Sequence, residues 1–315
     1  MRVLLAVPSR LDPAHAAVLR GLVPALRREG HVVRASADGF KGLEAASAGM
    51  DVVHAHVFSR AAPALARARL SVPLMLTHQG AAAALLDDPA EFARLAARAC
   101  AVTAVSAAGR AELAALLPGR KAAVVPNGAA PSLLRRPRRS KVPLILSVGR
   151  LAAYKGLDVL ALALADLGAR GVPFRWTACG PDQTGGRLPR FARRLGVPAL
   201  FTGTASAAAV RRWLARAEVF VQPSRAEGSP MALLEAMAAG LPVAAAAVGG
   251  VPALLGDAGL LVPPGDPAAL GRALARVLGD PALARRLGAR ARRRAGRFTW
   301  AAAARSYTRL YAQAA

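Results

Sequence analysis

The residues from 143 to 167 read PLILSVGRLAAYKGLDVLALALADL. The short apolar run Pro143–Val148 predicts a buried strand, and the longer apolar run Leu157–Leu167 predicts a helix. The loop between them starts at one glycine, Gly149, and ends at another, Gly156. A strand, a loop and a helix in this order indicate an α/β fold in which helices cover a parallel sheet.

The same alternation continues toward the C-terminus of the chain. Further strands are expected at Phe174–Ala178, Leu200–Phe201, Val219–Gln222, Val243–Ala246 and Leu260–Val262. Further helices are expected at Leu188–Leu195, Ala207–Arg216, Met231–Ala239, Pro267–Leu278, Ala282–Arg294 and Thr299–Tyr311. This half of the chain therefore predicts a complete doubly wound sheet.

The N-terminal half shows an equivalent pattern. Strands are expected at Val3–Val7, Val32–Ala35, Val52–Ala55, Leu74–Thr77, Ala101–Val105 and Ala122–Val125. Helices are expected at Ala14–Glu29, Ala61–Arg69 and Glu91–Ala99. A second Rossmann-like sheet is therefore predicted here.

The chain is too long for one hydrophobic core, because 315 residues usually divide into two domains. The stretch from 134 to 141, LRRPRRSK, is basic, contains a proline and has no periodicity, as a linker would. We expect Rossmann-like domains at residues 1–137 and 140–298, with 299–315 as a terminal helix. The two parallel sheets would face each other across a cleft, and a ligand would bind at the carboxyl ends of the strands.

The basic charge of the chain is high but diffuse. Lysine and arginine total 43 against 18 acidic residues, giving a formal net charge of +25. Aromatic residues make up only 4% of the chain, whereas nucleic-acid binders gather basic residues and interleave aromatic ones for stacking. The composition argues against a nucleic-acid partner and favours an anionic substrate or an anionic membrane surface.

Cysteine usage and hydropathy indicate a cytoplasmic protein, with peripheral contact to the inner face of the cell membrane as a further possibility. Cys100 and Cys179 lie in separate apolar runs, so we expect two buried free thiols. The apolar run after Met1 is too short for a secretory signal. The uncharged stretch 236–256 is interrupted by prolines and glycines, so no transmembrane segment is expected.

Two cations, Arg150 and Lys155, lie five residues apart in the loop that separates the first quoted strand from its helix. Arginine offers a planar fork and lysine a compact point charge, so the pair can hold one anion from two directions. The simpler alternative is a pair of surface cations that merely flank a loop.

A second cluster follows the strand that ends near Gln222. Residues 224–235 read SRAEGSPMALLE, with Glu227 before a turn and Glu235 on a helix that opens near Pro230. A helix N-terminus attracts phosphate, and two carboxylates beside it can hold sugar hydroxyls. Alternatively, Glu227 only stabilises the helix start and Glu235 is solvated. The apolar neighbours of Glu235 favour a functional role, because a carboxylate in such surroundings needs a partner.

With these two clusters the sequence resembles the retaining glycosyltransferases of family 4, which have the GT-B fold. The resemblance covers nearly the whole chain and is strongest from Leu144 to Pro264. The supporting motifs are DVVHAH at 51–56, LTH at 76–78, TAVS at 103–106, VPNG at 125–128, GLPV at 240–243, GGVP at 249–252, GLLVPPG at 259–265 and FTW at 298–300.

The resemblance implies a role for each matching residue. Arg150 and Lys155 would bind the donor diphosphate and neutralise its charge as it leaves. Neither a metal ion nor another cofactor would then be needed beyond the nucleotide-diphospho-sugar co-substrate. Glu235 would hold the donor ribose, Glu227 would contact the transferred sugar, and His78 would lie near the reacting carbon. The other donor-binding positions would be Gly228, Ser229, Pro230, Met231 and Ala232. The terminal helix would return to the N-terminal domain.

The implied activity is transfer of a hexosyl-type sugar, with retention of configuration, to a glycolipid, polysaccharide or small-molecule acceptor. Two alternatives stay open: another nucleotide-sugar enzyme on this fold, such as an epimerase, and a non-catalytic basic protein that binds membrane or nucleic acid. Residues 8–15, PSRLDPAH, lack the glycine pair that family members often carry after the first strand. The acceptor-side loop therefore departs from the family pattern.

The remaining histidines carry weaker signals. His54 and His56 are two residues apart on a predicted strand and point to the same face, as a metal-binding pair would. No third ligand accompanies them in sequence, so no metal is expected. His15 and His31 flank the first helix and are expected at the surface or as capping residues.

Overall fold

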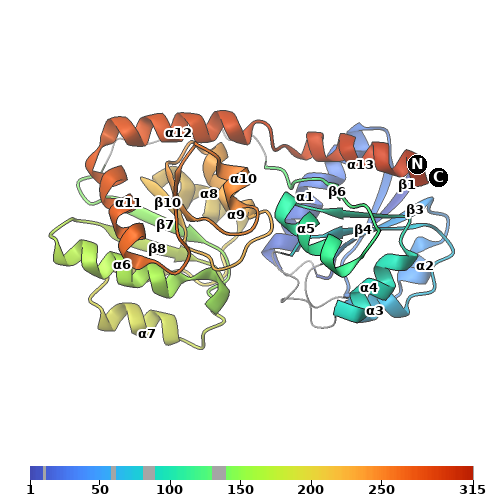
Figure 1. Ribbon diagram of the computed structural model, residues 1–315, viewed down its shortest axis with the longest axis horizontal. Helices are drawn as coiled ribbons and strands as arrows, with labels where there is room; N and C mark the ends of the chain where they lie inside the picture. The colour runs from blue at the N-terminus through green and yellow to red at the C-terminus, as the bar shows by residue number, and fades with distance from the viewer. Residues whose placement is uncertain (10–11, 58–61, 81–88, 130–139, 315) are drawn as a thin grey trace. The chain divides into compact units, whose positions relative to one another are not determined.

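The computed structural model describes residues 1–9, 12–57, 62–80, 89–129 and 140–314. The chain divides into two compact units. The N-terminal unit comprises Met1–Ala130, Glu227–Met231 and Phe298–Ala315, and the C-terminal unit comprises Pro131–Ala226 and Ala232–Arg297. Figure 1 shows the strands of each unit with helices beside them.

The N-terminal unit contains a six-stranded parallel sheet in the order β2-β1-β3-β4-β5-β6. Its strands are β1 (Arg2–Ala6), β2 (Val32–Ser36), β3 (Val52–Val57), β4 (Leu74–His78), β5 (Ala101–Ala104) and β6 (Ala123–Val124). Its helices are α1 (Pro13–Arg28), α2 (Leu43–Ser47), α3 (Ala62–Arg67), α4 (Pro89–Arg98), α5 (Ala107–Leu116) and α13 (Trp300–Ala314).

Two apolar cores lie on opposite faces of this sheet, because successive residues of a strand point in opposite directions. Val3 and Leu5 of β1 belong to a core that α1 and α13 cover, where Tyr307 is fully buried. Leu4 belongs to a second core, together with Phe92 of α4. All six residues of β3 are buried, as expected for a central strand covered on both faces.

The C-terminal unit contains a second six-stranded parallel sheet, in the order β12-β11-β10-β7-β8-β9. Its strands are β7 (Leu144–Val148), β8 (Arg175–Cys179), β9 (Ala199–Phe201), β10 (Val219–Gln222), β11 (Val243–Ala246) and β12 (Leu260–Val262). Its helices are the 3-10 turn η2 (Ala153–Lys155), α6 (Leu157–Ala169), α7 (Arg187–Arg194), α8 (Ala207–Arg216), α9 (Met231–Ala238), whose first residue is counted with the N-terminal unit, α10 (Val251–Leu255), α11 (Pro267–Gly279) and α12 (Pro281–Ala295).

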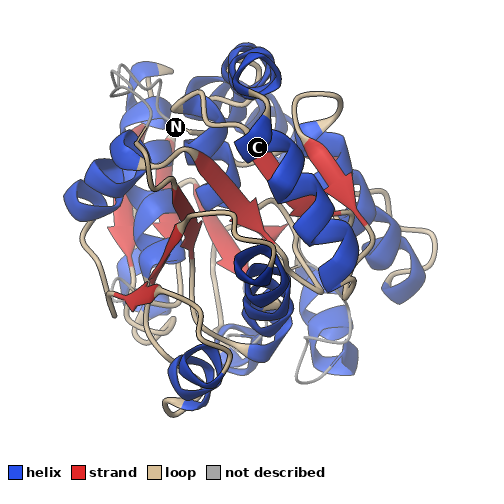
Figure 2. Cartoon of the chain, turned by 90° about the vertical axis from the view of Figure 1, so that its left-hand side faces the viewer, coloured by secondary structure: helices blue, strands red, loops and turns tan. Residues whose placement is uncertain are grey.

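The strand order of this sheet reverses between β7 and β10. The chain runs outward from β7 through β8 to β9, and then returns to place β10 on the other side of β7. At such a reversal the loops leaving the two strands diverge and leave a crevice at their carboxyl ends. Figure 2 shows helices on both sides of the strands.

The predicted α/β class is confirmed by these two parallel sheets. The strands Val219–Gln222, Val243–Ala246 and Leu260–Val262 and the helix Ala207–Arg216 have the predicted bounds, and the other predicted elements differ at their ends by up to three residues. Within the described residues, three α-helices, α2, α5 and α10, and the 3-10 turn η2 were not predicted. Both α2 and α10 are five residues long, too short for a helical period to be recognised.

Some predicted environments are wrong. Cys100 is exposed, because it occupies the turn between α4 and β5 before the chain enters the sheet, whereas Cys179 is buried. His15 and His31 are both buried instead of lying at the surface. The Nε2 atom of His31 lies 2.8 Å from Oγ1 of Thr308, so α13 covers this histidine. Among the described residues, no helix combines the length and apolarity that a membrane span requires.

Candidate active site

The loop that leaves β7 is fixed by backbone hydrogen bonds to the exit of β8. The amide of Gly149 donates to the carbonyl of Cys179 over 2.8 Å, and the amide of Leu151 donates to the carbonyl of Pro181 over 2.9 Å. Gly180 allows this approach, because a Cβ placed there would lie 1.9 Å from the carbonyl oxygen of Gly149. The first half of the loop is therefore held at the crevice between the strand ends.

The second half of the same loop lies against the exit of β10. Gly156 has a φ of +62°, and a Cβ at this position would lie 2.1 Å from the carbonyl oxygen of Pro223. Glycine is thus required at this position for two reasons, its backbone conformation and its contact. The loop brings Lys155 to the point where the β7 and β10 exits meet.

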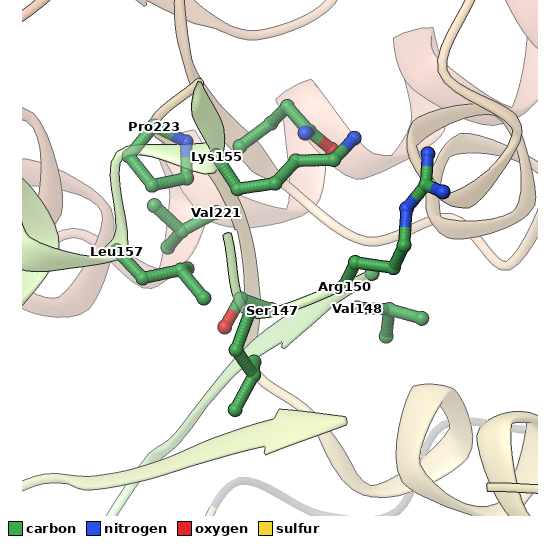
Figure 3. Close-up of a pocket in the computed structure, with 10 residues that line it drawn as sticks. Ser147, Val148, Arg150, Lys155, Leu157, Val221 and Pro223 are labelled. Carbon is green, nitrogen blue, oxygen red and sulfur yellow. The ribbon is translucent and has the colours of Figure 1, made fainter. Parts of the chain in front are cut away.

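A pocket lies at this point, within the C-terminal unit. It is lined by Ser147, Val148, Gly149, Arg150, Leu151, Lys155, Leu157, Val221, Gln222 and Pro223. Figure 3 shows the side chains of Arg150 and Lys155 extending past the pocket, with their charged ends toward the same side. The pocket occupies the expected place for a ligand in a doubly wound sheet, outside the strand ends and at the reversal of strand order.

The ring of Tyr154 packs against both cations. The Nζ of Lys155 lies 5.1 Å from the ring centre, and Cζ of Arg150 lies 6.0 Å from it. The Lys155 side chain also passes over Gly149, with Nζ 3.9 Å from the place that a Cβ would take. Arg150 and Lys155 thus lie beside the same aromatic ring, whose face attracts cations.

The Glu227 segment is distributed over both units. Glu227, Gly228, Ser229, Pro230 and Met231 are counted with the N-terminal unit, whereas Ala232 and Glu235 belong to the C-terminal unit. Glu227 is 6% exposed, and Glu235 is half-buried on the second turn of α9. The helix starts at Met231, as predicted, directly after Pro230.

His78 is the last residue of β4 and is buried in the N-terminal unit. Burial lowers the pKa of His78 to about 4, so its imidazole is neutral at physiological pH. Its ring packs on Phe92, 5.6 Å between ring centres, and its edge lies against Gly80. The carbonyl of Gly80 in turn contacts Gly228, where a Cβ would lie 2.6 Å from the oxygen. Within this unit the chain thus places the segment that follows His78 beside the segment that contains Glu227.

His54 and His56 both have hydrogen-bond partners within the protein. The two ring nitrogens of His54 lie 2.6 Å from the Tyr311 hydroxyl and 2.7 Å from Oγ1 of Thr77. The amide of Gln79 lies 2.7 Å from Nδ1 of His56. In the part of the chain that the structure describes, no group of three or more His, Cys, Asp or Glu side chains could hold a metal ion. These histidines therefore belong to a buried polar network under α13.

Several residues of the site were not singled out from the sequence. Ser147 and Gln222 line the pocket from the ends of β7 and β10. Tyr154 supports the two cations, and its position between them in the sequence was the available signal. Arg225 and Asp158 form an ion pair beside the loop, with Nη2 and Oδ2 2.6 Å apart. No periodicity connects two residues so far apart in sequence, so this pair could not be predicted.

Both halves of the chain match family models of glycosyltransferases. Residues 2–133 match the model described as Glycosyltransferase Family 4, and residues 142–280 match the model described as Glycosyl transferases group 1. D-inositol 3-phosphate glycosyltransferase 2 of Catenulispora acidiphila is 32% identical over 301 residues, which cover 84% of this chain and 70% of that protein. The D-inositol 3-phosphate glycosyltransferase of Streptomyces bingchenggensis is 35% identical over 201 residues, 60% of this chain and 44% of that protein. The matched region thus spans less than half the length of this second relative.

Solved structures share the fold. Sucrose-phosphate synthase of Thermosynechococcus elongatus superposes with a TM-score of 0.84 at 22% identity and covers 99% of each chain. HepE of Anabaena, solved in complex with UDP and glucose, superposes with a TM-score of 0.82 at 19% identity over 98% of each chain. These likenesses confirm the predicted two-domain GT-B fold. The chain belongs to family 4 of the glycosyltransferases, as its sequence motifs indicated.

Proposed function

We propose that this chain transfers a sugar from a nucleoside-diphosphate donor to an acceptor hydroxyl. The observation that carries the proposal is the pocket at the ends of β7 and β10, which Arg150 and Lys155 both line and where both lie beside the ring of Tyr154. Two fixed cations suit a diphosphate better than a single phosphate, since each can neutralise one phosphate group. The pocket that would hold the donor diphosphate lies in the C-terminal unit.

The two cations supply the main catalytic effect. When the bond between the sugar and the diphosphate breaks, negative charge grows on the departing oxygen. Cations already positioned there stabilise this charge without reorganisation, which is usually the largest single contribution to catalysis. Arg150 and Lys155 thereby perform the role that a divalent ion has in other transferases, and the reaction is metal-independent. Retention follows if the departing phosphate oxygen takes the proton of the acceptor on the same face of the sugar.

The remaining residues bind and orient the donor. Glu235 accepts hydrogen bonds from the ribose hydroxyls, and Glu227 accepts hydrogen bonds from the transferred hexosyl group. The backbone from Gly228 through Ser229 and Pro230 to Met231 and Ala232 lines the sugar and phosphate near the start of α9. His78 is neutral at pH 7 because of its burial. A neutral imidazole can lie beside the reacting carbon without repelling the positive charge that develops there.

A thermal-shift panel of UDP-, GDP- and ADP-sugars tests the donor site. A donor that binds only the folded chain raises Tm by an amount that grows with its concentration. We expect one donor to raise Tm and Arg150→Ala to abolish the rise. Arg170→Ala is the matched control, because Arg170 is an exposed arginine of the same unit, paired with Asp166. A rise that persists in Arg150→Ala contradicts the proposed donor site.

Product analysis with a labelled donor tests the reaction. Transfer of label to an acceptor, unchanged by EDTA, supports a metal-independent transferase. Conversion of the donor to an epimer without transfer supports the alternative chemistry on this fold, and a strict requirement for a divalent ion contradicts the role given to the two cations.

The acceptor is a glycolipid, polysaccharide or small molecule. An acceptor at an anionic membrane surface would agree with the positive net charge of the chain. Arg285, Arg286, Arg290 and Arg293 are exposed on α12. Each basic residue near an anionic lipid surface contributes about 1 kcal/mol. We expect flotation with vesicles that contain phosphatidylglycerol and none with pure phosphatidylcholine. Replacement of these four arginines by glutamine tests whether α12 is the contact.

A further inference from the structure

We propose that Arg225 and Asp158 are positioning residues for the donor site, and that they act by holding Lys155 in place. This inference rests on the proposed function, because it concerns the same diphosphate pocket. Neither residue lines the pocket. In this proposal their effect on a bound diphosphate passes through the loop that carries Lys155.

The contacts of Arg225 bracket Lys155 along the chain. The Arg225 backbone amide donates to the carbonyl of Tyr154 over 2.7 Å. Its guanidinium Nη1 donates to the carbonyl of Ala153 over 2.7 Å. The same guanidinium binds Asp158 through both carboxylate oxygens, Nη1 to Oδ1 at 2.8 Å and Nη2 to Oδ2 at 2.6 Å. One arginine thus fixes two residues immediately before Lys155 and one residue three positions after it.

These contacts come from the loop that follows β10, the partner strand of β7 at the reversal of strand order. The same two loops touch again at Gly156, whose Cα leaves no room for a side chain beneath the Pro223 carbonyl. Arg225 and Gly156 therefore hold the Lys155 turn against the β10 exit from two sides. A free lysine side chain is flexible, and binding a ligand costs entropy because the side chain must be ordered. If the backbone of Lys155 is already fixed, less entropy is lost and the diphosphate binds more tightly.

Stability alone does not account for this arrangement. The side chains of Arg225 and Asp158 are 42% and 48% exposed, and exposed ion pairs contribute only about 0–1 kcal/mol to folding. The pKa of Asp158 lies below its usual range because of its hydrogen bonds with Arg225, so the carboxylate stays ionised at neutral pH. Removal of the pair should therefore displace Lys155 and weaken diphosphate binding, but it should hardly change the free energy of unfolding.

Arg225 also carries a positive charge near the pocket, so positioning must be separated from long-range attraction. Asp158→Asn removes a negative charge, and electrostatics alone would tighten the binding of an anion. Positioning predicts the opposite, since the neutral amide cannot hold the guanidinium fork. Arg225→Lys keeps the charge but loses the bidentate contact, so positioning predicts weaker binding here too.

The experiment measures the affinity of the full chain for inorganic pyrophosphate and for UDP by titration calorimetry. We expect Arg225→Ala, Arg225→Lys and Asp158→Asn each to weaken binding about 5- to 50-fold, within the range that small misplacements of a binding group produce. The matched control is Arg170→Ala. It breaks an exposed arginine–aspartate pair at the C-terminal end of α6, the helix whose first turn contains Asp158. Its affinity should equal that of the unsubstituted chain, and the Tm of all four variants should agree within a few degrees.

The decisive measurement is a double-mutant cycle with Lys155→Ala. If Arg225 acts through Lys155, Arg225→Ala causes little further loss once the lysine is gone, so the two effects are not additive. Equal losses from Arg225→Ala in both backgrounds overturn the inference, as does tighter binding by Asp158→Asn. A different result tests the proposed function itself: if Lys155→Ala binds both probes as well as the unsubstituted chain, the diphosphate site is not at this pocket.

Discussion

The Nδ1 atom of His54 lies 2.6 Å from the hydroxyl of Tyr311, although 257 residues separate them in the chain. His54 is in the middle of β3, and Tyr311 is near the end of α13. Both side chains are completely buried. The terminal helix is therefore attached to the N-terminal sheet by a specific polar contact as well as by apolar packing.

Tyr311→Phe should lower the free energy of unfolding by about 1–3 kcal/mol, because it leaves a buried nitrogen of His54 without its partner. The substitution keeps the ring, so apolar packing of α13 hardly changes. Urea denaturation measures the effect. Arg305→Ala, on the exposed face of the same helix, is the control and should be neutral. Equal stability of Tyr311→Phe and the unsubstituted chain would show that the hydrogen bond contributes nothing net.

Stability should fall steeply as the pH drops below about 6.5. Burial lowers the pKa of His56 to about 3 and of His78 to about 4, and lowers that of His54 well below its usual value. The unfolded chain binds a proton at each histidine near pH 6.5, whereas the folded chain does not. Each histidine therefore removes about 1.4 kcal/mol of stability per pH unit between its unfolded and folded pKa values.

Urea denaturation at pH 7.5, 6.0 and 5.0 measures this slope. The neutral histidines cost no stability above pH 6.5 and cost more as the pH falls. The free energy of unfolding should therefore be highest at pH 7.5, lower at pH 6.0 and lowest at pH 5.0. His56→Gln, which keeps a polar side chain beside Gln79, should reduce the slope by the share of one histidine. A flat profile from pH 7.5 to 5.0 would contradict the neutral, buried state of all three rings.

Gly156→Ala should disable the donor site. An alanine here would have both a positive φ and a Cβ 2.1 Å from the Pro223 carbonyl oxygen, so the two loops would have to separate. Gly171→Ala is the matched control: its φ is +73° but nothing lies within 4 Å of the added Cβ. We expect the control to lose about 1 kcal/mol of stability from backbone strain alone and to keep pyrophosphate binding. Gly156→Ala should lose more stability than the control and should also lose pyrophosphate binding. If the two variants behave alike, the close contact between the two loops is contradicted.

Tyr154→Leu should weaken pyrophosphate binding about 2- to 5-fold, the effect expected when cations lose an aromatic face worth about 0.5–1 kcal/mol. Tyr154→Phe keeps the face and should bind as tightly as the unsubstituted chain. Titration calorimetry separates the two. Weaker binding by Tyr154→Phe would mean that the hydroxyl, and not the ring, matters.

Local sequence patterns predicted the fold because each element of a parallel sheet has a local signature. Buried strands such as Val219–Gln222 are short apolar runs, and amphipathic helices such as Ala207–Arg216 have a clear period. Elements of five residues, such as α2 and α10, contain too little sequence for a period. Strand order was inaccessible from local pattern, since the return of β10 to the side of β7 depends on packing between distant segments.

For the candidate site, the sequence predicted the residues that have a chemical signature. Arg150 and Lys155 were recognised by charge and spacing. Tertiary contacts were not predicted: Arg225 meets Asp158 from 67 positions away, and His31 is buried by a helix that the chain forms only at residue 300. Cys100 shows the opposite error, because an apolar neighbourhood in sequence does not bury a residue that lies in a turn.

The N-terminal unit is discontinuous, and this has a consequence for how the protein is made. On the ribosome, the strands β1 to β6 emerge first, but α13, which covers Val3, Leu5 and Met75 together with α1, is synthesised only after the entire C-terminal unit. Until then the part of this face that α13 covers exposes apolar side chains to other chains and to chaperones. The unit that is translated first is therefore the last to be completed, and a nascent chain arrested before Trp300 would carry a sheet with one face only partly covered.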